Sequence, residues 1–250
     1  MQNITQGMRL DIACVKFGLT ESRNKAQSLI KKGKVCVNGT ICKRASYAVE
    51  SCDSISFLES LCFVSRAGEK LHYFLESNPY LTQDFHRLNA LDIGSSTGGF
   101  SEVLLRLGVE SVVCVDVGSN QLHTSLRQNR RVRFYERTDI RNFARENQES
   151  QTFSLVVCDV SFISIKDILS AIKALASGLL ILLFKPQFEV GVEAKRNKKG
   201  VLMESQSAIN ALNQTLVLLE NEGFKILVCE ESKVKGKEGN VEFFIAAQKL

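Results

Sequence analysis

The chain has 250 residues, of which 44% are hydrophobic and 24% are charged, and its formal net charge at pH 7 is +5. This composition is typical of a folded globular protein and argues against disorder, and the longest apolar run, around Leu179–Phe184, is too short to span a bilayer. The chain has eight cysteines without a C-x-x-C pair and only three histidines, which favours free thiols and argues against a metal site. Its N-terminus lacks a secretory signal, so we expect a cytoplasmic protein.

The basic charge is concentrated at the start of the chain. Residues 1–59 contain nine Lys and Arg against five Asp and Glu, whereas residues 60–250 contain 23 against 22. An attached nucleic-acid-binding module would produce this asymmetry, and a solvated basic face is the alternative.

The first segment predicts a small α+β unit. Helical spacing of apolar residues predicts helices over 8–17 and 20–33, alternation predicts strands over 35–37 and 55–57, and Asn38-Gly39 predicts a tight hairpin turn. Basic side chains on and around the second helix are candidate donors to phosphates. The candidate RNA-binding residues here are Arg9, Arg23, Lys25, Lys31, Lys32 and Lys34.

One pattern in this segment is specific to a known domain. The residues R-L-D-x-x-x-x-x-x-G-L-x-x-S-R-x-x-A-x-x-L-I-x-x-G-x-V-x-V-N-G, from Arg9 to Gly39, resemble the RNA-binding domain first described in ribosomal small-subunit protein four. The resemblance implies that the second helix and the loop after it follow an RNA backbone. We expect this domain over 1–59, a linker over 60–64 and a second domain over 65–250.

In the second domain, apolar runs alternate with helical patterns. The predicted strands are 88–93, 111–117, 132–135, 153–159, 178–185, 224–230 and 241–247, and the predicted helices are 65–77, 99–107, 119–128, 164–176 and 204–222. The alternation predicts a doubly wound, Rossmann-like α/β fold that binds ligands at the carboxyl ends of its strands. No helix fits between the last two strands, so we expect them to be antiparallel, as in methyltransferase sheets.

The run Leu91–Phe100, LDIGSSTGGF, places small residues between a predicted strand and a helix. Small residues let backbone N–H groups approach a ligand closely. The spacing fits neither a P-loop nor G-x-G-x-x-G, and it favours a cofactor with a nucleoside and a carboxylate, such as S-adenosylmethionine. Asp92 would bind the methionine amino group or, alternatively, structure the loop. The candidate cofactor-binding residues of this run are Asp92, Gly94, Ser95, Ser96, Thr97, Gly98, Gly99 and Phe100.

Further acids follow other predicted strands. Asp116, with Val117 beside it, ends an apolar strand about twenty residues after the glycines, where a carboxylate can accept both ribose hydroxyls of a nucleoside. Asp139 could similarly reach the adenine amino group. For each acid the alternative is a cap on the next helix. Asp159 also joins the candidate cofactor-binding residues.

Charged residues interrupt four otherwise apolar stretches of the second domain. In chain order they are Lys70, Asp159, Lys185 and Glu242, and they resemble the tetrad of FtsJ-type ribose 2′-O-methyltransferases. With the basic domain in front, nearly the whole chain is similar to the TlyA family. The resemblance implies catalysis by these four residues, S-adenosylmethionine as cofactor, and 2′-O-methylation of cytidine in ribosomal RNA of a ribosomal subunit.

The tetrad also suits the chemistry. A ribose hydroxyl must lose its proton as it attacks a sulfonium methyl group, and an ordinary lysine, with a pKa near ~10.4, is protonated at neutral pH. Burial and a neighbouring cation can lower a lysine pKa to roughly 7–8. Lys185 would be the base or would stabilise the alkoxide, Lys70 would be the second cation, and the acids would orient both ammonium groups.

Two features near the tetrad are candidates for RNA contact. The segment 191–200 carries basic residues that would clamp an RNA backbone or form a solvated loop. They are Lys195, Arg196, Lys198 and Lys199. Phe162 and Phe188 flank the tetrad and would stack on a base or pack in the core.

Three rival functions remain as alternatives. The first is a non-catalytic ribosome-binding protein, against which the intact tetrad argues. The second is a membrane-active haemolysin, but the sequence has no membrane-active segment. The third is a pseudouridine synthase, which would have no use for the glycine run. The shorter family members resemble those that modify large-subunit RNA alone. Since the chain begins eight residues before Arg9 and ends soon after its last strand, we expect large-subunit RNA as substrate.

Overall fold

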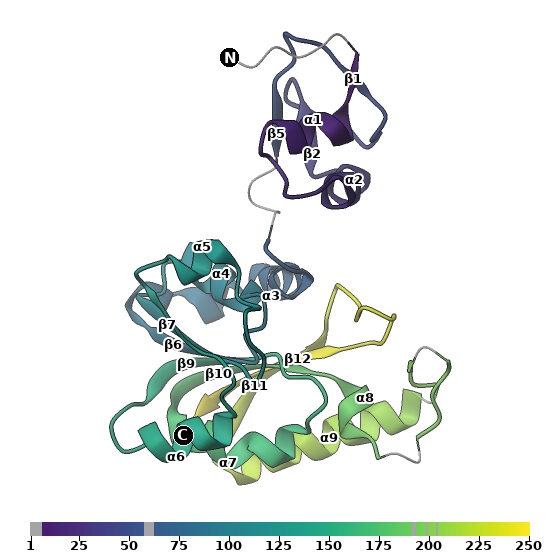
Figure 1. The fold of residues 1–250 in the computed structure, drawn as a ribbon. Coiled ribbons are helices and arrows are strands. Elements are labelled where there is room, and N and C mark those ends of the chain that lie inside the picture. Colours follow the sequence, from purple (N-terminus) through teal and green to yellow (C-terminus); the bar gives the residue numbers. More distant parts are fainter. Residues whose placement is uncertain (1–6, 58–62, 192–193, 199, 204) are drawn as a thin grey trace. The chain divides into compact units, whose positions relative to one another are not determined.

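The computed structural model describes residues 7–57, 63–191, 194–198, 200–203 and 205–250. Contacts between residues divide the chain into two compact units, Met1–Cys62 and Phe63–Leu250, each of which has its own hydrophobic core. Figure 1 shows the elements of both units.

The first unit is small and mixes helices with short strands. Its elements are β1 (Met8–Arg9), α1 (Leu10–Lys16), α2 (Arg23–Lys31), β2 (Val35–Val37), β3 (Thr40–Ile41), β4 (Ala48–Val49) and β5 (Ile55–Phe57). The first helix is shorter than predicted because residues 8–9 pair with β4. Ser22 caps α2, and Asn38 and Gly39, with φ of 52° and 77°, turn β2 into β3.

The second unit contains a seven-stranded sheet. Its strands are β6 (Asn89–Ile93), β7 (Ser111–Val115), β8 (Val132–Tyr135), β9 (Phe153–Cys158), β10 (Ala176–Phe184), β11 (Phe224–Glu231) and β12 (Phe243–Lys249), in the order β11-β12-β10-β9-β6-β7-β8. Strand β12 is antiparallel to both of its neighbours, β10 and β11, and all other neighbouring strands of this sheet are parallel to each other. The predicted Rossmann-like sheet and its antiparallel last pair are therefore confirmed.

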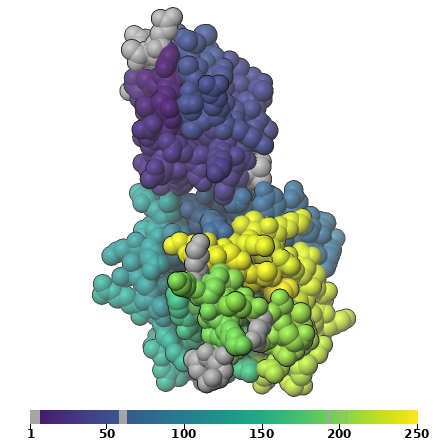
Figure 2. Space-filling model, turned by 90° about the vertical axis from the view of Figure 1, so that its right-hand side faces the viewer, coloured from purple at the N-terminus to yellow at the C-terminus, as the bar shows by residue number. Residues whose placement is uncertain are grey.

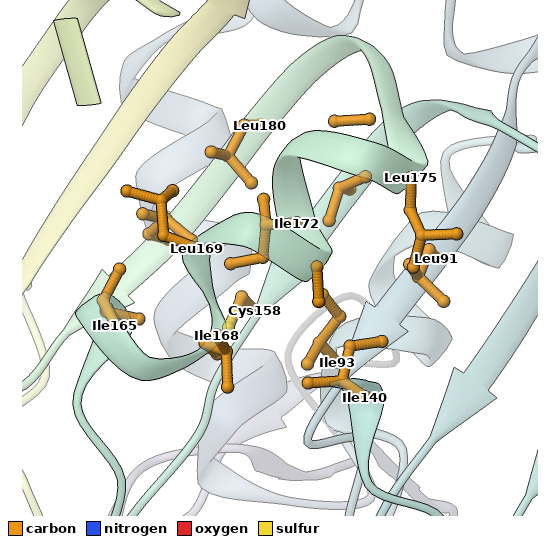
Figure 3. Packing of buried hydrophobic residues seen from close by; sticks show 14 of the residues in the cluster. Leu91, Ile93, Ile140, Cys158, Ile165, Ile168, Leu169, Ile172, Leu175 and Leu180 are labelled. Carbon is orange, nitrogen blue, oxygen red and sulfur yellow. The ribbon is translucent and has the colours of Figure 1, made fainter. Parts of the chain in front are cut away.

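Helices cover both faces of this sheet (Figure 1). One face carries α3 (Arg66–Ser77), α4 (Gly99–Arg106) and α5 (Thr124–Arg127), and the other carries α6 (Ile140–Asn147), α7 (Ile165–Leu175) and α9 (Ser205–Asn221). Short segments complete the unit: α8 (Pro186–Glu189) and the 3₁₀ turns η2 (Pro79–Thr82) and η3 (Phe85–Arg87). Figure 3 shows how Ile168 and Ile172 of α7 pack with Leu91 of β6 and Leu180 of β10.

Two helix predictions were wrong. The helix predicted over 119–128 is confined to Thr124–Arg127, and α6 was not predicted although Ile140, Phe143 and Ala144 show helical spacing. Helix α6 is otherwise polar, so its apolar face is narrow and gives a weak signal in the sequence. Neither error changes the sheet order.

The chain order creates a switch point between β6 and β9. From β6 the chain moves to β7 and β8 on one side, and it then returns to β9 on the other side of β6. In open α/β sheets, ligands bind outside the carboxyl ends of strands at such a point. The glycine loop follows β6 at this place.

Candidate active site

Two buried lysine–carboxylate pairs lie at the carboxyl ends of the central strands. Lys70 Nζ is 2.6 Å from Glu242 Oε2, and Lys185 Nζ is 2.6 Å from Asp159 Oδ1. The relative exposures of Lys70, Lys185 and Glu242 are 8%, 9% and 3%. The structure thus brings all four tetrad residues to the same part of the unit, although they are far apart in the sequence.

Each of the four residues is placed by a different element. Lys70 lies on α3, Asp159 directly follows β9, Lys185 directly follows β10, and Glu242 directly precedes the antiparallel β12. Because β12 runs in the opposite direction, its first residues lie at the same end of the sheet as the last residues of β10. The reversed strand is therefore what brings Glu242 to the site.

The Lys185 ammonium group has two partners. It forms the ion pair with Asp159, and it donates a hydrogen bond to Ser161 Oγ at 2.8 Å. Burial raises the pKa of the Asp159 carboxyl, and the positive charge of Lys185 opposes that rise. Sequence reasoning did not assign Ser161, although it lies only two residues after Asp159 on the same loop.

Two cavities meet at this site. The first, of about 360 Å³, is lined on its polar side by Ser96, Asp116, Gln121 and Asp139. The second, of about 350 Å³, is lined by residues that include Ser65, Lys70, Asp92, Lys185 and Lys237. Both cavities are lined by Gly94, Ser96, Asp159 and Ser161, so they adjoin each other beside the glycine loop.

Asp92 is fully buried and only partly satisfied. Its Oδ2 accepts hydrogen bonds from Ser101 N at 3.0 Å and Ser101 Oγ at 2.6 Å, whereas its Oδ1 has no partner among the described residues. Burial raises the pKa of this carboxyl to about 7. An unpaired buried oxygen that lines a cavity is suited to a cationic ligand group.

The glycines of the loop have different roles. At Gly94, where φ is +76°, an added Cβ would lie 3.0 Å from the Asp159 carbonyl oxygen, and this residue lines both cavities. Gly98 and Gly99 line neither of them. An added Cβ at Gly98 would lie 2.1 Å from Leu126 Cδ1, and one at Gly99 would lie 2.1 Å from Ser65 Oγ. Their small size serves packing, and their contact with the cofactor stays a prediction.

Two other predicted cofactor residues, Asp116 and Asp139, already have hydrogen-bond or ion-pair partners in the protein. Asp116 accepts hydrogen bonds from Ser96 N at 2.8 Å and Gly118 N at 2.6 Å. Asp139 caps α6 and pairs with Arg141, which holds the pKa of the carboxyl below its usual range. The other predicted positions lie on cavity walls: Ser95, Thr97 and Phe100 on the second, and Val117 on the first.

In the first unit, a buried carboxylate organises the predicted RNA-binding arginines. Asp11 accepts from Arg9 Nε at 3.0 Å, Arg23 Nε at 2.9 Å and Gln27 Nε2 at 2.6 Å, and these contacts lower its pKa. Lys25, Lys31 and Lys32 lie at least partly on the surface, but Lys34 is buried. The side chain of Lys34 has little free surface for a phosphate, and its contact with RNA stays a prediction.

The basic segment after α8 is only partly available for RNA. Lys195 and Lys198 are exposed, whereas Arg196 donates to the backbone carbonyls of Gln187 and Ala194 and so shapes its own loop. Lys199 lies outside the described residues.

Phe162 is an exposed aromatic side chain at the rim of the first cavity. It is 90% exposed, its φ is +66°, and its ring lies 4.9 Å from that of Phe188. The alternative that Phe162 packs in the core is therefore wrong. A positive φ at a bulky residue costs free energy and is found most often at functional sites.

The described ranges contain neither a metal-binding cluster nor a helix that could span a membrane. Within them, no three His, Cys, Asp or Glu side chains are grouped in a way that would hold a metal ion. No helix in the described part of the chain is both long enough and apolar enough to cross a membrane.

Comparisons with known proteins identify both units. Residues 63–249 match the family of FtsJ-like methyltransferases, and residues 8–55 match the S4 domain. A Campylobacter jejuni protein named 23S rRNA (cytidine-2′-O)-methyltransferase TlyA is 41% identical, with 95% of this chain and 98% of that protein covered. A Mycobacterium tuberculosis protein named 16S/23S rRNA (cytidine-2′-O)-methyltransferase TlyA is 35% identical, with 95% of this chain and 88% of that protein covered.

A solved structure extends the similarity to the fold. A Streptococcus thermophilus protein described as a candidate hemolysin superposes with a TM-score of 0.69 at 32% sequence identity. The superposition covers 98% of this chain and 90% of that chain.

Proposed function

Since the chain belongs to the FtsJ-like methyltransferases, with an S4 domain in front, we propose that it transfers a methyl group from S-adenosylmethionine to the ribose 2′-hydroxyl of a cytidine in large-subunit ribosomal RNA. The observation that carries this proposal is the pairing of Lys70 with Glu242 and of Lys185 with Asp159 beside two adjoining cavities. Buried lysines held by carboxylates suit the activation of a hydroxyl group.

The cavities fit S-adenosylmethionine. The unpaired Asp92 Oδ1 would accept from the methionine ammonium group, and Asp116 in the other cavity would accept from ribose hydroxyls. The absence of a side chain at Gly94 leaves room between these ends. When bound, S-adenosylmethionine supplies an electrophilic methyl group on a sulfonium centre.

The contacts of Lys185 favour it over Lys70 as the base. In its amine form, Nζ has two N–H bonds and one lone pair. Asp159 pairs with Nζ and Ser161 accepts a hydrogen bond from it, so the two N–H bonds would point towards these residues and the lone pair away from both of them. Lys185 can then accept the proton of the 2′-hydroxyl as the oxygen attacks.

Lys70 acts as the second cation. Its ammonium group is held by Glu242 and lines the same cavity as Lys185. A fixed positive charge there stabilises the negative charge that develops on the ribose oxygen without any reorganisation during the reaction. Phe162 offers an exposed ring on which the base of the target nucleotide can stack.

The proposal of large-subunit RNA as the substrate is supported by the names of two relatives. The relative named for 23S RNA alone is 41% identical, against 35% for the one named for both 16S and 23S RNA. The basic surface of α2 in the S4 domain would hold the RNA by its phosphates.

The test is methylation of purified subunits. Large and small ribosomal subunits from a strain that lacks this gene are incubated with the full chain and tritiated S-adenosylmethionine, and nucleosides are then identified by mass spectrometry. We expect 2′-O-methylcytidine from large subunits. Lys185→Ala should reduce its formation by about 10²–10⁴-fold while leaving cofactor binding intact.

Two outcomes would contradict the proposal. A methyl group on a base instead of the ribose would exclude the assigned chemistry. Labelling of small subunits alone would exclude the assigned substrate.

A further inference from the structure

The loop between β11 and β12 carries three exposed lysines that the proposed function has not used. They are Lys233, Lys235 and Lys237, with Glu238 beside the last. Within the described residues, none of these three ammonium groups has an ion-pair partner. Three cations on one short surface loop form a strong local positive field.

The loop lies at the reaction site. Lys237 lines the second cavity together with Lys70 and Lys185, and the loop ends at Glu242. An added Cβ at Gly236 would lie 2.6 Å from Glu242 Oε1, so the loop backbone packs directly against this carboxylate. A ligand of the lysines would therefore lie next to the reacting ribose.

Hydrogen bonds give the loop a defined shape. Ser232 N donates to the Glu242 carbonyl at 2.8 Å, and Gly236 N donates to the Asn240 carbonyl at 2.8 Å. The Arg66 guanidinium of α3 donates to the carbonyls of Lys235 and Gly236. The backbone polar groups thus face inward, while the lysine side chains remain exposed.

A second basic loop adjoins the first. Asn240 Oδ1 accepts from Leu202 N at 3.1 Å, which joins the β11–β12 loop to the segment that carries exposed Lys195 and Lys198. Figure 2 shows the yellow atoms of the C-terminal part beside the green atoms of this earlier segment on one face. The two loops together form a basic rim beside the cavity.

We infer that the β11–β12 loop binds the phosphates that flank the target nucleotide. Phosphates are the anions that repeat along an RNA strand, and lysine binds them without reading the sequence. The inference rests on the proposed function, because it assumes that RNA enters the second cavity. It adds a phosphate-binding element outside the S4 domain.

The test compares two double variants of the full chain. Lys233→Gln with Lys235→Gln removes two charges of the loop and changes no side chain that lines the cavities. Arg130→Gln with Lys225→Gln is the matched control, because both side chains are exposed and lie at the opposite end of the sheet, just before β8 and at the start of β11. Binding to large subunits from the gene-deleted strain is measured by filter retention at several salt concentrations, and steady-state methylation is measured in parallel.

We expect the loop variant to bind subunits about tenfold more weakly at low salt. The slope of log K against log salt should become shallower by about 1–2, because two phosphate contacts are lost. KM for subunits should rise while kcat and the affinity for S-adenosylmethionine stay unchanged. The control variant should match the wild-type chain.

Equal salt slopes for the two double variants would overturn the inference. So would a loss of kcat with unchanged subunit binding, because the loop would then act only on Glu242. A failure of the proposed function is separate, since it would appear as absent 2′-O-methylcytidine with the wild-type chain itself.

Discussion

At the scale of single residues, the ion pair and the hydrogen bond of Lys185 specify how it can act. Asp159 Oδ1 and Ser161 Oγ lie 2.6 Å and 2.8 Å from Nζ. With both contacts the lysine is held in one orientation, whereas with Asp159 alone it can rotate about the remaining ion pair. Ser161 is thus a positioning residue in the proposed reaction.

Ser161→Ala should lower kcat about tenfold, because a hydrogen bond to a charged group contributes about 1.5–3 kcal/mol and part of it is replaced by water. KM for ribosomal subunits should remain unchanged. Ser161→Thr keeps the hydroxyl and should retain most of the activity, as measured by steady-state methylation. Equal losses in the two variants would show that the hydroxyl itself is not required.

If Asp92 binds the cofactor as proposed, its raised pKa should make cofactor binding dependent on pH. Burial raises the pKa of its carboxyl from 3.8 to about 7, so the folded protein binds a proton that the unfolded chain releases between these values. The stability that this proton contributes is present below about pH 4 and is lost as the pH rises towards about 7. A cationic ligand group has the opposite preference, since it favours the ionised carboxylate.

Affinity for S-adenosylhomocysteine should therefore rise by up to about tenfold between about pH 6 and about pH 8, as the ionised fraction of Asp92 increases. Asp92→Asn should bind more weakly and without this pH dependence, as measured by isothermal titration calorimetry. A wild-type profile that is parallel to that of the variant would assign the ammonium site elsewhere.

At the scale of elements, close contact between α3 and α4 holds one wall of the second cavity. The backbone N–H of Val64 donates to Glu102 Oε2 at 2.6 Å, and an added Cβ at Gly99 would lie 2.6 Å from Gly68 N. This contact brings Lys70 of α3 to the glycine loop at the start of α4. Gly99 thus supports the site, because its small size lets α3 and α4 pack closely.

Gly99→Ala should destabilise the second unit by about 1–3 kcal/mol, because an added methyl group forces α3 and α4 apart. The melting temperature measured by circular dichroism should fall by about 3–10 °C. Gly191→Ala is the matched control, since no atom lies within 4 Å of its added Cβ. Equal melting temperatures for both variants would contradict the packing role.

At the scale of the whole molecule, the candidate phosphate-binding residues of the S4 domain and the two cavities belong to different units. Each unit has its own buried core, and the cofactor cavities are lined entirely by residues of the second unit. Changes to the charge of the S4 domain should therefore affect RNA affinity without affecting the cofactor. This separation can be tested in the full chain.

Lys31→Gln combined with Lys32→Gln should weaken binding to large ribosomal subunits by about tenfold at low salt, because two candidate phosphate contacts are lost. Affinity for S-adenosylhomocysteine should be unchanged. Filter binding and calorimetry measure the two quantities separately. A parallel loss of cofactor affinity would show that the units do not work independently.

Much of the fold could be predicted from local pattern. Apolar runs located all seven strands of the large sheet to within a few residues, because buried parallel strands are nearly continuous in hydrophobic residues. Helix α6 was missed, since its apolar face is narrow, and α5 was predicted too long. The tetrad residues were recognised by their resemblance to a family, because a charged residue at a strand end has no distinct local signal.

The sequence by itself determined the alternation of strands and helices, the glycine loop and the basic first unit. Only the tertiary structure decided which lysine pairs with which acid, that Gly98 and Gly99 serve packing, that Lys34 is buried, and that the β11–β12 loop borders the cavity. The physical reason is that local spacing fixes which way a side chain points within its own element. Contacts between distant segments depend on strand order and direction, which are set by how the whole sheet packs.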